Sequence, residues 1–241
     1  MLGVFLVGAG TAIATGLGAI PVILLGADRA ERLRPALLGL AAGVMAVAAI
    51  WGLLLPAIDD GSTVAVVAGT LAGGAFLLGA RTLLGHSAHA PEGRAERASI
   101  LVFVVLFVHS LPEGLAVGSA MASATEGLAV FVVVAIAVQN IPEGTSVAIP
   151  MQAAGQPPWH LFWAAVATSA PQPFGAVIAY ALVEQIEGLL PISFAFAAGA
   201  MLTLVLVEVG PEGWRGGRLQ SVAGAAIGAA AMLALSAALG V

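Results

Sequence analysis

The chain carries one short phrase twice, as HSLPEG at residues 109–114 and as QNIPEG at residues 139–144. Each copy lies inside a run of Val, Ala, Leu and Phe that is long enough to cross a lipid bilayer, at 99–121 and 127–150. Each phrase therefore places a glutamate, and a nitrogen or oxygen donor four residues before it, where water is scarce. An ionisable group costs roughly 2.5–3.5 kcal/mol there on insertion scales. The default reason for keeping one is a pathway for a substrate or an ion.

The composition is that of an integral membrane protein. Hydrophobic residues make up 60% of the 241 residues, charged residues only 9%, and the mean hydropathy is +1.06. Cysteine is absent, which excludes disulfides and thiolate metal sites. The stretch 1–26 has no basic residue before its apolar run, so we expect a first membrane helix there and not a cleaved signal peptide.

Apolar runs of about 20 residues or more predict an all-α membrane domain of eight transmembrane helices that occupies the whole chain, 1–241. The runs, numbered here as spans 1 to 8, lie at 2–26, 36–56, 63–83, 99–121, 127–150, 160–183, 190–210 and 219–240. The longest connection that carries arginines is 84–98, between spans 3 and 4.

The charged residues predict the orientation. The chain has no lysine, and its eight arginines flank alternate connections: Arg29, Arg32, Arg34, Arg81, Arg94, Arg97, Arg215 and Arg218. The opposite connections carry only acids, which are Asp59, Asp60, Glu126, Glu184 and Glu187. By the positive-inside rule the arginine-bearing connections, including 84–98, are cytoplasmic and both termini are extracytoplasmic. Arginine without lysine, in a chain rich in Ala and Gly, favours a multi-pass protein of a prokaryotic cytoplasmic membrane.

A second internal similarity joins spans 2 and 7. AAGVM at 41–45 matches AAGAM at 197–201, and each span has a proline near its end. Spans 2 and 7 are expected to run in opposite directions, as are spans 4 and 5, which carry the repeated phrase. Similarity between antiparallel segments is typical of inverted repeats in transporters. For the AAG pair alone, a chance match in an Ala- and Gly-rich chain is the simpler explanation.

The repeated phrase predicts a metal site. Residues four apart share a helix face, so His109 and Glu113 point the same way on span 4, as Gln139 and Glu143 do on span 5. If the two faces meet, the converging nitrogen and oxygen donors suit Zn²⁺, Cd²⁺, Co²⁺, Fe²⁺ or Mn²⁺. One divalent cation would also nearly neutralise two buried glutamates. For His109 alone, a hydrogen bond to a neighbouring helix is the plainer explanation.

With these motifs the chain resembles the ZIP (ZRT/IRT-like) family of divalent metal transporters, in its compact prokaryotic form. The resemblance covers nearly the whole length. It implies a bundle in which spans 1–3 and 6–8 are inverted repeats around spans 4 and 5. It also implies movement of a divalent metal, Zn²⁺ or Cd²⁺ as substrate and not as cofactor, into the cytoplasm through a midplane site. His109, Glu113, Gln139 and Glu143 would be its principal ligands. A homodimer is compatible with the resemblance.

The departures from the family pattern concern a second metal position. Where many members carry further ligands, this chain has the neutral residues Ser110, Asn140 and, in span 6, Gln172. We therefore predict one tight metal site and not a binuclear pair. Met45, in the AAGVM phrase, is placed near the site by the resemblance, although a buried methionine usually only packs.

Two weaker candidate sites lie outside the repeated phrases. Glu208 and Glu212 are near the cytoplasmic end of span 7, where the resemblance suggests an exit role, although Glu212 could simply lie in the membrane interface near Arg215. His86 and His89, in the 84–98 connection, could bind a metal weakly, although such a loop is more often a solvated connector.

Two other functions fit part of the pattern. A proton-coupled carrier of a small organic solute would use Glu113 and Glu143 as proton sites, but the spans offer no central arginine or lysine for such a ligand. An intramembrane metalloenzyme of the HExxH type needs a glutamate after its first histidine, and Ser110 stands there instead. We therefore expect a transporter and not an enzyme.

Overall fold

The computed structural model describes residues 1–87, 94–186 and 188–241, with the side chains outside 84–105. In chain order its elements are α1 (Leu2–Leu17), α2 (Ala19–Leu25), α3 (Ala27–Val47), the π-helical segment η1 (Ala48–Leu54), α4 (Leu55–Asp60), α5 (Thr63–Ser87), α6 (Arg94–Ala122), α7 (Leu128–Ala153), α8 (Pro158–Thr168), α9 (Pro171–Gln185), α10 (Leu189–Leu204), the π-helical segment η2 (Val205–Val209), α11 (Gly210–Gly216) and α12 (Arg218–Leu239).

These elements join into long apolar helices. Among the described residues, seven helical stretches are long and apolar enough to cross a membrane: Leu2–Leu25, Ala27–Asp60, Thr63–Leu83, Leu128–Ala153, Pro158–Gln185, Leu189–Gly216 and Arg218–Leu239. The 29-residue helix α6 is the eighth long helix. The prediction of an all-helical membrane protein is confirmed.

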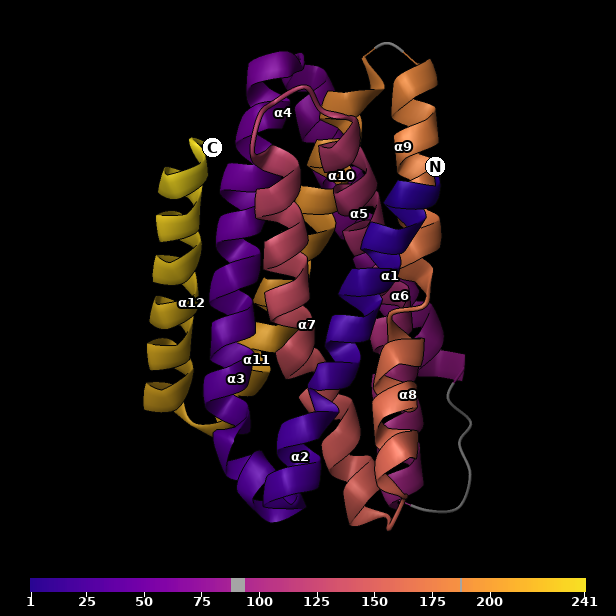
Figure 1. Ribbon diagram of the computed structural model, residues 1–241, viewed down its shortest axis with the longest axis vertical. Coiled ribbons are helices and arrows are strands. Elements are labelled where there is room, and N and C mark those ends of the chain that lie inside the picture. The colour runs from indigo at the N-terminus through magenta and orange to yellow at the C-terminus, as the bar shows by residue number, and fades with distance from the viewer. Residues whose placement is uncertain (88–93, 187) are drawn as a thin grey trace.

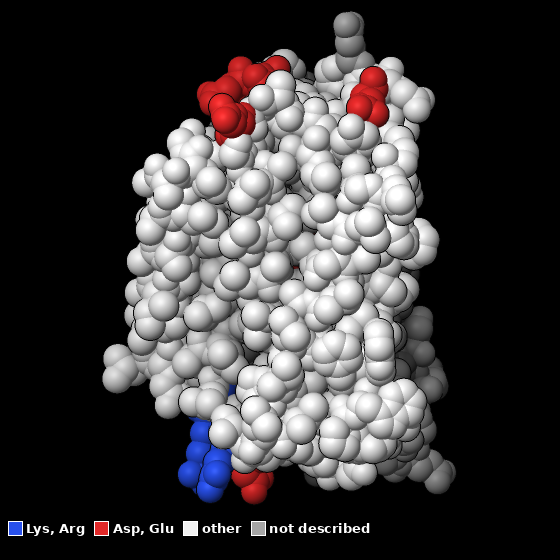
Figure 2. All heavy atoms as spheres, viewed as in Figure 1, with Lys and Arg blue, Asp and Glu red and all other residues white. Residues whose placement is uncertain are grey.

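The charges separate to the two ends of the bundle. In Figure 1, α4 and the connection from α6 to α7 lie at one end, and the α2–α3 junction and the start of α12 lie at the other. Figure 2 shows acidic side chains at the first end, and arginines with one acidic group at the second, with an uncharged flank between them. We call these the acid end and the arginine end. An uncharged flank between charged ends is what contact with lipid requires.

Prolines and glycines shape the helices near the middle of the bundle. Gly18 separates α1 from α2, and Pro171 begins α9 directly after the break that ends α8. Proline has no N–H to donate, so each proline leaves a carbonyl of the preceding turn without its helical partner. The segments η1 and η2 come just before Pro56 and Pro211 in the same way. Such π-helical segments are frequent at functional sites.

The glycines of the two repeated phrases allow two very close helix contacts. A Cβ atom on Gly114 would lie 2.3 Å from the carbonyl oxygen of Gln172, and one on Gly144 would lie 1.8 Å from that of Thr15. No real side chain tolerates such distances, so only glycine permits α6 to pack on α9 and α7 to pack on α1 here. These contacts place both glutamates of the phrases beside the breaks in spans 6 and 1.

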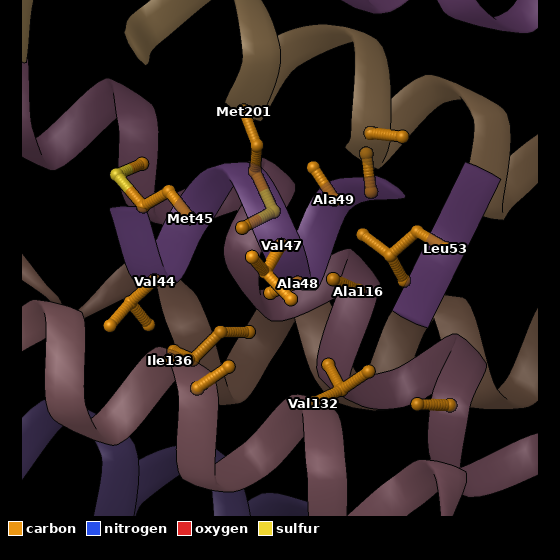
Figure 3. Packing of buried hydrophobic residues seen from close by; sticks show 14 of the residues in the cluster. Val44, Met45, Val47, Ala48, Ala49, Leu53, Ala116, Val132, Ile136 and Met201 are labelled. Carbon is orange, nitrogen blue, oxygen red and sulfur yellow. The ribbon is translucent and has the colours of Figure 1, made fainter. Parts of the chain in front are cut away.

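On the acid-end side of the repeated phrases, apolar side chains fill the centre of the bundle. Figure 3 shows them converging from α3, η1, α6, α7 and α10. We call this group the apolar seal; its residues are Met45, Ala48, Ala49, Leu53, Ala116, Val132, Ile136 and Met201. All are buried and apolar, so these side chains offer water and ions no polar partner.

Candidate functional site

The predicted ligands lie in the interior, on the adjacent helices α6 and α7. Glu113 is 1% exposed, His109 4%, Gln139 0% and Glu143 5%. The helices meet along the faces that carry these side chains, because Gln139 of α7 donates a hydrogen bond to Glu113 of α6. The expectation that the two faces approach each other therefore agrees with the geometry at this pair.

Glu113 has both carboxylate oxygens occupied. Its Oε1 accepts a hydrogen bond from Gln139 Nε2 at 2.7 Å, and its Oε2 accepts one from Gln172 Nε2 at 2.6 Å. Bonds to a charged acceptor are stronger than those between neutral groups. Two neutral amides, one from α7 and one from α9, thus hold this carboxylate in a fixed position.

A neutral polar cluster continues from Gln172 towards α1. Asn140 Nδ2 lies 2.7 Å from the carbonyl oxygen of Thr11 and 3.2 Å from Gln172 Oε1. Gln172 Nε2 also lies 3.4 Å from Asn140 Oδ1. Both side chains are fully buried, so their hydrogen bonds are made to each other and to the protein. The two residues predicted to weaken a second cation position are therefore linked in one amide network with Glu113.

The Ser110 hydroxyl forms its hydrogen bonds with backbone carbonyls and not with the glutamates. Its Oγ donates to the carbonyl oxygens of Leu106 and of Thr168, both at 3.0 Å. The second bond ties α6 to the end of α8. The structure thus gives Ser110 a helix-joining contact.

The two ring nitrogens of His109 have different surroundings. Its Nε2 lies 4.0 Å from Glu208 Oε2 of η2, and its Nδ1 has no hydrogen-bond partner among the described residues. Together with Glu113 it borders a small cavity of about 10 Å³ that is also lined by Met45 and Met201. Met45 therefore lies beside the predicted ligands, and Met201 of the matching AAGAM phrase lies there too.

Glu143 differs from Glu113 because it lines a large cavity. It lines a cavity of about 310 Å³ at the arginine end, together with Glu208, Glu212 and other residues of α3, α5, α6, α10, η2 and α11. Its Oε1 has no hydrogen-bond partner among the described residues, and neither has Gln139 Oε1. Buried oxygens without a donor are costly unless a cation or water satisfies them. The cavity thus reaches from the arginine end to an unsatisfied carboxylate.

Two arginines hold the wall of this cavity. Arg34 of α3 forms an ion pair with Glu212 of α11. Arg81 of α5 donates from Nη1 to the carbonyl oxygen of Val207 at 3.1 Å. Pro211, four residues after Val207, has no N–H to offer that carbonyl. Glu212 therefore belongs to the cavity and also to an ion pair.

The predicted ligands are neighbours but do not surround one point. Among the described residues, no three His, Asp or Glu side chains come close enough together to hold a metal ion. Glu113 is turned to its amides, whereas Glu143 and Glu208 face the cavity. The side chain of His86 and the whole of His89 lie outside the described residues.

Several residues of this site were not singled out from the sequence. Arg81 and Arg34 served only as markers of orientation, Met201 only as part of a matching phrase, and Gly114 and Gly144 only as letters of the motif. One usable signal was present for the glycines, because small residues are enriched where two membrane helices approach closely. The role of Arg81 depends on a contact 126 residues away along the chain.

Comparison with known proteins agrees with this architecture. Residues 80–236 match the family described as ZIP zinc transporters. The zinc transporter GufA of Myxococcus xanthus is 35% identical over 223 residues, which cover 87% of this chain and 87% of that protein. The chain belongs to the ZIP family.

Further ZIP family members differ in how much of them the chain covers. The zinc transporter ZIPB of Bordetella bronchiseptica is 35% identical over 255 residues, which cover 97% of this chain and 80% of that protein. The zinc transporter ZIP11 of Homo sapiens is 41% identical over 128 residues, which cover 51% of this chain and 37% of that protein. The family consists of transporters, so the predictions of family and of a non-enzymatic function are confirmed.

Proposed function

We propose that this ZIP family zinc transporter moves its metal from the acid end to the arginine end, and so into the cytoplasm, through a site on α6 and α7. The principal ligands in this proposal are His109, Glu113, Gln139 and Glu143. The observation that carries it is the unsatisfied Glu143 carboxylate, which lies where the 310 Å³ cavity ends against α7. A divalent cation would give this carboxylate oxygen a partner of opposite charge.

The proposed direction rests on charge and on packing. The arginine end faces the cytoplasm by the positive-inside rule, which places both termini outside. The cavity opens towards this end, whereas the apolar seal fills the opposite side. The conformation thus corresponds to a carrier that is open to the cytoplasm and closed to the outside. Glu208 and Glu212, which line the cavity, are the proposed exit groups.

We propose one tight metal per chain. At the position where a second cation would lie, Gln172 already donates a hydrogen bond to Glu113, and Asn140 bonds to Gln172. A second metal would have to displace these buried amides. The remaining set of imidazole, carboxylate and amide oxygen also suits Cd²⁺, Fe²⁺, Co²⁺ and Mn²⁺, so these are proposed as alternative substrates.

Inverted repeats explain two pairs of irregular helices. The π-helical segments η1 and η2 each follow an AAGxM phrase by a few residues, in spans 2 and 7. Spans 1 and 6 are each broken into two helices, α1–α2 and α8–α9. Discontinuous helices at corresponding positions are typical of transporters built from repeats. This pattern supports repeats of spans 1–3 and 6–8 around α6 and α7.

Alternating access would be a movement of two helix groups against each other. Glycine contacts join α6 to α9 and α7 to α1 in one group. In the other, a Cβ on Gly43 would lie 2.1 Å from the Ala225 carbonyl oxygen, joining α3 to α12. Between the groups lie the side chains of the apolar seal, which have no directional bonds to break. Sliding at this surface would move Glu113 and Glu143 relative to the two ends.

Zinc uptake into proteoliposomes tests the proposal. The purified protein is reconstituted around a trapped zinc-sensitive dye, and the wild type is compared with Glu143→Ala, His109→Ala and the surface control Glu126→Gln. We expect wild-type and Glu126→Gln proteins to take up zinc, and the other two to lose uptake while their melting temperatures stay near that of the wild type. Normal uptake by both site variants would show that the ligand assignment is wrong.

A further inference from the structure

The cavity at the arginine end contains more positive charge than a cation exit needs. Its lining includes three carboxylates, Glu143, Glu208 and Glu212, and also three guanidinium groups, Arg34, Arg81 and Arg215. A guanidinium group cannot bind Zn²⁺, and it repels a dication at short range. Two of these arginines nevertheless make specific contacts that hold them beside the carboxylates.

Arg34 takes up one of the exit carboxylates. Its Nη2 is paired with Glu212, and its Nη1 lies 3.4 Å from Glu31 on its own helix. Glu212 Oε1 can therefore bind a metal only if Arg34 moves away. An ion pair at a partly exposed position breaks easily, because solvent screens the attraction and pairing costs side-chain entropy.

Arg81 is positioned beside the other exit carboxylate. Its Nη1 bonds to the Val207 carbonyl, one residue before Glu208, and Arg81 and Glu208 line the same cavity. Glu208 Oε2 has no hydrogen-bond partner among the described residues, and its neighbour His109 Nε2, at 4.0 Å, is itself a possible metal ligand. The Val207 carbonyl anchors Arg81 on η2, next to Glu208 in the chain.

We infer that Arg81 and Arg34 are tethered counter-cations of the exit carboxylates. They balance Glu208 and Glu212 while no metal is bound, and they compete with zinc for these groups when it arrives. This inference rests on the proposed exit through the arginine-end cavity. Competition of this kind makes zinc binding weak at the cytoplasmic face, which speeds release and hinders rebinding from the cytoplasm. Both arginines act on zinc through the carboxylates and are positioning residues.

A structural role for the same arginines predicts different behaviour. Both contacts join helices, α3 to α11 and α5 to η2, so removing them could simply loosen the bundle. A looser bundle would bind zinc less tightly or unchanged. The counter-cation role instead predicts tighter binding together with slower turnover, a combination that loss of structure does not produce.

Equilibrium binding and uptake, measured on the same purified proteins, distinguish the two roles. Zinc affinity is measured by competition with a chelating dye, and uptake by the trapped-dye assay with zinc preloaded inside. The variants are Arg81→Gln, Arg34→Gln and Arg81→Lys, with Arg32→Gln as the control. Arg32 lies on the same end but outside the cavity lining.

We expect Arg81→Gln and Arg34→Gln to bind zinc about five- to tenfold more tightly, because a positive charge near a dication is removed. Their maximal uptake should fall, and preloaded zinc should inhibit them at correspondingly lower concentrations. Arg81→Lys, which keeps the charge, and Arg32→Gln should behave like the wild type.

Unchanged or weaker zinc affinity in both glutamine variants would overturn the inference while leaving the proposed transport intact. If only one variant folds, its affinity alone decides the outcome. Failure of the wild type to take up any zinc would instead overturn the proposed function, and this inference with it.

Discussion

Glu113 and Glu143 occupy the same place in two copies of one phrase, yet their surroundings are opposite. Glu113 has an amide on each oxygen and lies against the small cavity near Met45. Glu143 has an oxygen with no partner among the described residues and faces the large cavity at the arginine end. The same Pro-Glu-Gly sequence therefore yields one carboxylate held by two amides and one with an unpartnered oxygen.

The difference comes from the helices that pack against each copy. Gly114 brings α6 onto the start of α9, which presents Gln172 to Glu113. Gly144 brings α7 onto α1. There the Thr15 hydroxyl forms a hydrogen bond of 2.6 Å with the Ser169 hydroxyl and not with Glu143. The two copies of the phrase thus differ in their surroundings, because Gln172 bonds to Glu113 and has no counterpart at Glu143 among the described residues. The lesson is that a repeated motif sets the residue types, and its neighbours set the roles.

The largest expected effect concerns the packing that both copies share. Gly144→Ala places a Cβ 1.8 Å from a backbone carbonyl that cannot move without shifting α1. We expect a loss of about 3 kcal/mol or more of stability, above the usual range for overpacking. The melting temperature in detergent measures it.

Gly10→Ala, on α1 and with nothing within 4 Å of its Cβ, is the control and should change the melting temperature little. Equal stability of Gly144→Ala and the wild type would contradict the close approach of α7 and α1.

Replacing each glutamate by leucine sharpens the comparison directly. Glu113→Leu removes the acceptor of Gln139 Nε2 and the closer of the two acceptors of Gln172 Nε2, which should cost about 2 kcal/mol. Glu143→Leu removes a buried carboxylate with an unpartnered oxygen, so stability should stay the same or rise. Both variants should lose zinc uptake.

Thermal melting of the two variants side by side gives the stability readout, and zinc uptake gives the functional one. Equal destabilisation by both substitutions would show that the two carboxylates do not differ in the way the structure indicates.

A carboxylate at position 172 should remove the hydrogen bond from Gln172 that distinguishes Glu113 from Glu143. Gln172→Glu replaces the amide that lies 2.6 Å from Glu113 with a second acid, which destabilises the metal-free protein. We expect zinc to stabilise this variant more than the wild type, and the number of tightly bound zinc ions to rise from one to two per chain. Elemental analysis after equilibrium dialysis counts the metal.

Gln156→Glu, at an exposed position, is the control and should bind one zinc ion. Two tight zinc ions in the wild type would contradict the single-site proposal.

The smallest expected effect concerns Ser110, which was considered as part of a second metal position. Ser110→Ala removes hydrogen bonds to the carbonyls of Leu106 and Thr168 and should cost about 1 kcal/mol. Zinc affinity should not change, because the hydroxyl is directed to backbone carbonyls. Binding that weakens severalfold would assign Ser110 to the metal site.

The class of protein, the number of long helices and the residue types of the site were determined by the sequence alone. Length and hydropathy are local properties, and a 20-residue apolar run must become a helix in a bilayer because its backbone has no other hydrogen-bond partners there. The repeated phrase likewise identified the buried glutamates and the family resemblance, which the comparisons confirmed.

Only the tertiary structure decided what each of those residues does. Gln172 is 59 residues from Glu113, and Arg34 is 178 residues from Glu212, so no local pattern could pair them. Which glutamate is held by amides, which one lines a cavity and which arginines lie beside Glu208 and Glu212 all depend on the helices that pack together. Those neighbours are selected by close packing at glycines and by apolar contacts between distant segments, and both depend on the assembled bundle.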